Sequence, residues 1–123
     1  MGIVYIMMFT IIVGGVAPST TKVTATIYHA DPAQCNEDYL TTASGEKINE
    51  ADPQGHRWIA VSRDLEPLGY TFGTQVIISG AEEMNGVWTV QDRMNKRWAH
   101  RIDFLVNKTK RGGKWENVSL RIK

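Results

Sequence analysis

Short stretches in which polar and apolar residues alternate constrain the fold of this chain most strongly. In residues 22–29 (KVTATIYH), Val23, Ala25 and Ile27 share one face and the residues between them share the other. A period of two predicts a half-buried β-strand. No segment has the period of a long capped helix, and residues 62–65 predict only one helical turn, which Pro67 discourages from continuing.

Further runs of strand composition follow, separated by turn-forming Gly, Pro and Asn. Six short strands with such turns predict an all-β domain, either a closed barrel or a sandwich. A chain of 123 residues leaves room for one domain, and we find no internal repeat or linker. The predicted strands span residues 22–29, 58–62, 74–79, 86–91, 101–106 and 118–123.

The N-terminus is an apolar run, residues 3–13 (IVYIMMFTIIV). It is too short for a stable membrane span, which takes about 20 apolar residues. Small residues follow it up to Ser19, as in a cleavable secretory signal. The interpretation is a signal peptide over residues 1–19, an exported protein, and a domain over residues 20–123. The alternative is a buried first strand, because no Lys or Arg precedes the run.

Charge and cysteine content exclude several classes of partner. The net charge is +1 with mixed signs, so neither nucleic acid nor an anionic membrane is predicted as a partner. Cys35 is the single cysteine, so no internal disulfide forms. Cys35, His29 and Asp31 fit no recognised ligand spacing, and we predict no metal and no cofactor. The oligomeric state stays open, with a monomer expected.

The segment from Asp92 to Asp103 carries the candidate chemistry. Its two carboxyl groups are eleven residues apart, one ending a strand and the other inside the next. Strand alternation places Asp103 on the same face as Arg101. One interpretation is a structural salt bridge from Asp103 to Arg101 or Arg93. The other is a carboxyl whose pKa is raised by partial burial and by a second carboxylate, making it a proton donor near neutral pH.

Three motifs in order resemble a known family. They are residues 42–46 (TASGE), residues 59–62 (IAVS) followed by 72–76 (FGTQV), and residues 87–92 (VWTVQD) followed by 101–103 (RID). The stretch of roughly eighty residues that contains them resembles the double-psi β-barrels of rare lipoprotein A, the three-aspartate domains, membrane-bound lytic transglycosylase A and the expansins. The resemblance implies a six-stranded double-psi β-barrel in a single domain with short helical turns.

The resemblance also implies an activity and a site. Asp103 falls on the catalytic acid of the transglycosylases, Asp92 on their supporting aspartate, and Thr42 on a threonine of the same groove. The implied substrate is peptidoglycan or a related polysaccharide. Asp103 would act as general acid and base while the C6 hydroxyl of the muramic acid attacks C1 and forms an anhydro sugar.

Further substrate contacts are predicted around the two aspartates. Thr42 and Arg101 are candidates to hydrogen-bond the sugar, Tyr28 to bind it, and Trp98 either to stack on a ring or to pack in its loop. The rival hypothesis is a non-catalytic, expansin-like glycan-binding module with Tyr28, Trp88 and Trp98 as stacking platforms. A third possibility is an interaction domain that uses the barrel only as a scaffold.

Overall fold

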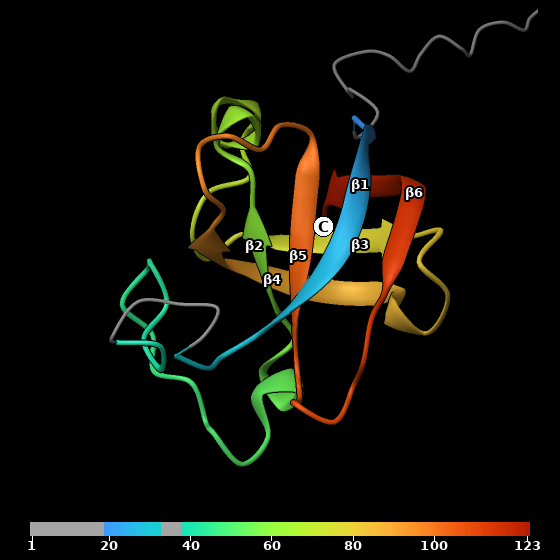
Figure 1. The fold of residues 1–123 in the computed structure, drawn as a ribbon. Helices are drawn as coiled ribbons and strands as arrows, with labels where there is room; N and C mark the ends of the chain where they lie inside the picture. Colours follow the sequence, from blue (N-terminus) through green and yellow to red (C-terminus); the bar gives the residue numbers. More distant parts are fainter. Residues whose placement is uncertain (1–18, 33–37) are drawn as a thin grey trace, which may run out of the picture.

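A computed structural model describes residues 19–32 and 38–123, which form six strands and three short 3-10 turns (Figure 1). Nearly all of the predicted signal peptide, and Cys35, lie outside the described residues. The strands are β1 (Thr21–His29), β2 (Trp58–Val61), β3 (Gln75–Ser79), β4 (Gly86–Arg93), β5 (Arg101–Val106) and β6 (Lys114–Ile122). The turns are η2 (Pro53–His56), η3 (Arg63–Leu68) and η4 (Glu82–Met84).

The strands close into a barrel in the order β1-β5-β2-β4-β3-β6. The pairs β1–β5 and β2–β4 are parallel, and the other four pairs are antiparallel. The strand pairing is symmetric between the two halves of the chain. If β1 and β4, β2 and β5, and β3 and β6 swap places, each strand pair maps onto a strand pair of the same direction. The two halves are thus interlocked by a pseudo-twofold, as in a double-psi barrel, which confirms the predicted fold class.

The barrel interior is filled by the residues that strand alternation turns inward. Phe104 lies at its centre, with its ring 4.7 Å from that of Trp88 and 5.7 Å from that of Trp115. Such tilted and edge-on ring pairs stabilise a core beyond the area they bury. The largest fully buried side chains are Trp88, Phe104, Ile59, Leu65, Ile78, Met84, Ile102, Leu105, Leu120, Val61, Val76 and Val90.

The suggestion that Trp88 is a stacking platform is wrong. Its side chain is 1% exposed, because the alternation of β4 turns it inward together with Val90. The indole Nε1 donates to the backbone oxygen of Met84 at 2.7 Å, and the Arg57 guanidinium lies 4.2 Å from the ring centre. Trp88 therefore serves the core and has no free face for a ligand.

Element boundaries differ from the prediction where polar residues enter a strand. β5 has the predicted bounds, but β6 begins at Lys114, four residues early, because residues 114 and 115 pair with β1. η3 continues through Pro67, because its i→i+3 bonds do not use the i−4 carbonyl that a proline ring obstructs in an α-helix. η4 occupies the connection between β3 and β4, and Gly86 (φ 122°) opens β4.

A second, smaller apolar cluster covers part of the outside of the barrel. Leu105 points outward from β5 and is fully buried against Ala30 and Ile48, with Tyr28, Leu40 and Trp58 packed around them. The covering segment lies between β1 and β2. Asp103, two residues before Leu105 on the same outer face, lies beside this cover and borders a cleft.

Candidate functional site

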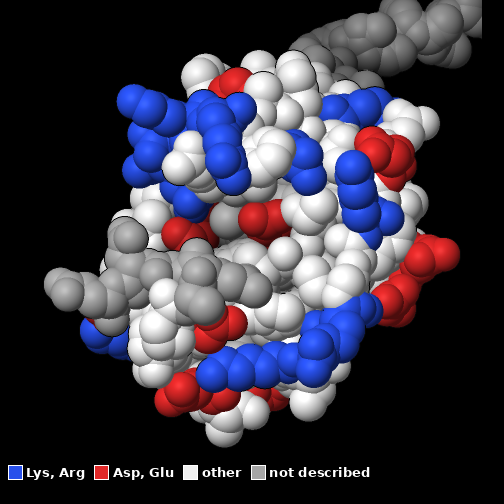
Figure 2. Space-filling model, in the orientation of Figure 1, with Lys and Arg blue, Asp and Glu red and all other residues white. Residues whose placement is uncertain are grey.

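A cleft of about 680 Å³ lies on the outer face of the barrel. Its floor comes from β1, β5 and β2, and its walls from the segment after residue 38 and from the β4–β5 connection. Figure 2 shows acidic side chains recessed in the middle of this face, with Lys and Arg side chains around them. The lining residues are Ile27, Tyr28, Asp38, Tyr39, Thr41, Thr42, Ala43, Ile48, Ala60, Asp92, Arg93, Met94, Asn95, Arg97, Trp98 and Asp103.

Strand register brings the two predicted acids together. Ala60 of β2 pairs with Asp103 of β5 on one side and with Asp92 of β4 on the other. Residues directly opposite in a ladder place their side chains on the same face. Asp92 and Asp103 thus lie on either side of the Ala60 methyl group. Their Cα atoms are two strand spacings, about 10 Å, apart. The small Ala60 side chain keeps the space between the two carboxyl groups open.

A register shift in β4 places Asp92 in this row. Trp58 pairs with Thr89 and Ile59 with Val90, but Ala60 pairs with Asp92 rather than with Gln91. The extra residue is a β-bulge, a device that re-aims side chains next to functional sites. The backbone oxygen of Gln91 accepts from the Ser44 N–H at 3.2 Å and so ties the wall of the cleft to the bulge.

Asp103 is largely buried at the floor of the cleft. Burial raises the pKa of its carboxyl, and the negative charge of Asp92 acts in the same direction. The Thr26 hydroxyl, which donates to Asp103 Oδ1 from the paired position on β1, and the charge of Arg101 oppose this rise. The pKa of Asp103 is raised on balance, so this carboxyl keeps a proton at higher pH than an ordinary aspartate.

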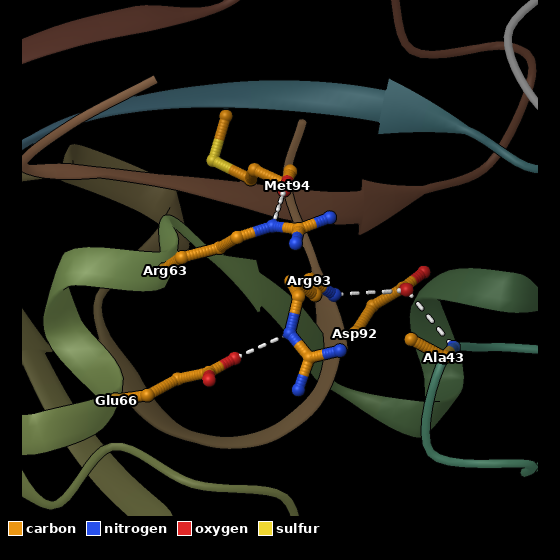
Figure 3. Close-up of polar contacts among 6 residues, drawn as sticks. All are labelled: Ala43, Arg63, Glu66, Asp92, Arg93 and Met94. Carbon is orange, nitrogen blue, oxygen red and sulfur yellow. Dashed lines mark hydrogen bonds and ion pairs between the residues drawn. The ribbon is translucent and has the colours of Figure 1, made fainter. Parts of the chain in front are cut away.

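Asp92 is held by three donors, two of which, the backbone N–H groups of Ala43 and Arg93, are drawn in Figure 3. Its Oδ1 accepts from the backbone N–H groups of Ala43 at 3.0 Å and of Arg93 at 2.9 Å, and its Oδ2 accepts from the Tyr28 hydroxyl at 3.0 Å. An ionised carboxylate has only acceptor sites, which these donors match. The Arg93 side chain points away from Asp92, and its Nε lies 2.5 Å from Glu66 Oε2.

Neither predicted salt bridge to Asp103 forms. Arg93 pairs with Glu66 instead, and no ion pair of Asp103 occurs among residues 19–32 and 38–123. Of the two interpretations of Asp103, the geometry matches a carboxyl of raised pKa. Its neighbour Arg101 contributes charge but no direct bond.

Thr42 borders the cleft but uses its hydroxyl within its own turn. The Thr42 Oγ1 accepts from the Glu46 N–H at 3.1 Å and lies 2.9 Å from the Ser44 hydroxyl. The side chain is 4% exposed. Its bonds shape the turn that delivers the Ala43 N–H to Asp92.

Trp98 lines the cleft on the β4–β5 connection and is half-buried. The guanidinium carbons of Arg97 and Arg101 lie 4.8 and 4.2 Å from the centre of its ring. Arg101 itself is not among the residues that line the cleft, and its Nε is buried without a hydrogen-bond partner.

Five of the six predicted site residues thus meet at one cleft: Asp103, Asp92, Thr42, Trp98 and Tyr28. Their roles toward a ligand remain predictions. Sequence reasoning missed Thr26, Ala43 and Ala60. Alternation in residues 22–29 gave the face of Thr26, but only the β1–β5 register sets it beside Asp103.

Fold and cleft together define a class: a closed double-psi β-barrel with an aspartate pair in an external groove. Comparisons with family models, with curated proteins and with solved structures give no match for this chain. In the part of the chain that the structure describes, no group of three or more His, Cys, Asp or Glu side chains is placed to hold a metal ion. No helix within those residues has the length and apolar character to cross a membrane.

Proposed function

We propose that this protein is a lytic transglycosylase-like enzyme that cleaves β-1,4 bonds of peptidoglycan or a related polysaccharide. One observation carries the proposal: the largely buried Asp103 carboxyl, whose pKa is raised, and the Asp92 carboxylate, which accepts three hydrogen bonds, flank Ala60 in the same open cleft. A carboxyl whose pKa is raised by burial is the pattern of the general acid in glycan cleavage.

Asp103 is the proposed acid. Protonated, it donates its proton to the glycosidic oxygen, and the bond from that oxygen to C1 breaks. The C6 hydroxyl of the same sugar then attacks C1, and the Asp103 carboxylate accepts the hydroxyl proton, which restores the acid and leaves a 1,6-anhydro product. One carboxyl suffices because the nucleophile belongs to the substrate, whereas a hydrolytic glycosidase needs a second as base or nucleophile.

Asp92 has a positioning role in this proposal. Its bonds to Ala43, Arg93 and Tyr28 hold its carboxyl group in place beside the site. Its charge favours the protonated form of Asp103 and would stabilise the positive charge that develops at C1.

Digestion of purified peptidoglycan tests the proposal. The protein is incubated with sacculi, and soluble fragments are analysed by mass spectrometry for anhydro-muropeptides. We expect such products from the wild type. Binding to sacculi without any product would exclude the enzyme and leave the glycan-binding module. If the protein neither binds sacculi nor releases product, the interaction-domain hypothesis is the one that remains.

Replacing Thr26 with Val tests the assignment of the acid. Loss of the hydroxyl removes a bond that lowers the pKa of Asp103. That pKa therefore rises further, and the active protonated form persists to higher pH. The alkaline limb of the pH–rate profile should move up, while the maximal rate falls by about tenfold at most, the worth of one hydrogen bond.

Thr24→Val is the matched control for Thr26→Val. Thr24 lies on the same outward face of β1, but its hydroxyl donates to Glu116 at 2.9 Å rather than to Asp103. The alkaline limb of the pH–rate profile of Thr24→Val should stay where it is in the wild type. An unmoved limb in Thr26→Val would mean that Asp103 is not the group whose protonation limits the rate.

A further inference from the structure

The charge of the cleft is divided between its walls. Between Asp92 and Asp103 the chain carries no acidic residue and four cations: Lys96 and Arg97 on the β4–β5 connection, and Arg93 and Arg101 at the strand ends that flank it. The opposite wall contains Asp38. In Figure 2, Lys and Arg side chains gather above the recessed acidic atoms, over the region where Figure 1 draws the β4–β5 connection. Among the residues that line the cleft, the two cations, Arg93 and Arg97, thus lie on the side of the β4–β5 connection, and Asp38 lies on the other side.

Two of the four cations of this wall, Arg93 and Arg101, already have an anionic neighbour. Arg93 is paired with Glu66 at 2.5 Å. Arg101 lies close enough to Asp103 and Glu116 to interact electrostatically with both. Arg97 lines the cleft, and no described carboxylate forms an ion pair with it. Arg97 is therefore the cleft-lining arginine whose charge remains available.

The contact of Arg97 with Trp98 leaves the N–H donors of the Arg97 guanidinium available to a ligand. With its carbon 4.8 Å from the ring centre, the cation is held against the indole. The N–H groups of a guanidinium lie in its plane and form a rigid fork that matches a carboxylate. A cation held on an aromatic ring thus keeps these donors for a ligand and loses less side-chain freedom when the ligand binds.

We infer that Arg97, held by Trp98, is a binding site for a carboxylate carried by the glycan, so that the ligand of the cleft is an acidic polysaccharide. The inference deepens the proposed function and rests on it for the glycan. The division of charge also orients the chain, because a carboxylate at the opposite wall would face Asp38. This assigns Trp98 to holding Arg97 rather than to stacking on a sugar.

A matched pair of glycans tests the inference. The probes are oligosaccharides of β-1,4-linked N-acetylglucosamine, either neutral or carboxymethylated and of equal length, and the measurement is the Kd by calorimetry in low salt. The wild type should bind the carboxymethylated probe about tenfold more tightly, as a charge-assisted hydrogen-bonded pair provides. This preference should shrink as added salt screens the charges.

Arg97→Gln should abolish the preference, so that this variant binds the carboxymethylated probe no more tightly than the neutral one. Arg111→Gln is the matched control: this exposed arginine lies on the β5–β6 connection, outside the residues that line the cleft, and the preference should persist. Equal affinities of the wild type for both probes, or a preference that survives in Arg97→Gln, would overturn the inference. The absence of anhydro products would overturn the proposed reaction instead, since this test measures binding alone.

Discussion

Asp103→Asn is expected to lower the rate of anhydro-product formation by about 10²–10⁴-fold, the usual contribution of a general acid–base group. The amide has nearly the shape of the carboxyl and can still accept from Thr26, but it has no proton to give to the glycosidic oxygen. The measurement is the initial rate of release from sacculi under identical conditions for both proteins.

The same substitution should stabilise the fold at neutral pH. The pKa of Asp103 is higher in the folded chain than in the unfolded chain, so the folded state binds more protons between these two values. Wild-type stability is therefore lost as the pH rises from the unfolded value through the folded one. The substituted amide does not titrate, so the variant should melt at a higher temperature than the wild type above this window and at the same temperature below it.

Asp52→Asn provides the control for Asp103→Asn. Asp52 is exposed, lies just before η2 and is not among the residues that line the cleft. The rate of anhydro-product release by Asp52→Asn should equal that of the wild type. Activity retained in Asp103→Asn would place the acid elsewhere, and a lower melting temperature at neutral pH would contradict the raised pKa of Asp103.

Phe104→Ala is expected to destabilise the barrel by about 3–5 kcal/mol, the range for deleting a buried aromatic ring. Phe104 is 0% exposed and touches the rings of Trp88 and Trp115. Its ladder partners Ile27 and Ile59 lie on the strands to either side. A closed barrel cannot collapse onto the missing ring without breaking strand pairs, so a cavity should remain.

Urea unfolding followed by tryptophan fluorescence measures this loss. Leu68→Ala removes a large apolar side chain that is 56% exposed, and it should change the free energy of unfolding by no more than about 0.5 kcal/mol. A loss under about 1.5 kcal/mol in Phe104→Ala would show that the core repacks around the gap.

Local sequence pattern predicted the elements well where one face of a strand is apolar. Residues 101–104 alternate between polar and apolar, residues 105 and 106 are apolar, and β5 has the predicted bounds. The first residues of β6 are polar or aromatic without alternation, so their pairing with β1 left no local signal. For Trp88, the local signal was present but was not used. The aromatic side chain suggested a stacking platform for a ligand, whereas the alternation of β4 places Trp88 on the same inward face as Val90.

The candidate site, too, could be predicted from the sequence only in part. The sequence by itself determined an all-β chain with two acids at strand positions, because alternation and turn residues act over a few neighbours. Only the tertiary structure decided that Asp92 and Asp103 flank Ala60, that Thr26 bonds one acid and that Tyr28 bonds the other. These contacts join residues 64 and 77 positions apart. They depend on strand order and on one bulge, which are set by the closure of the whole barrel rather than by any local run of residues.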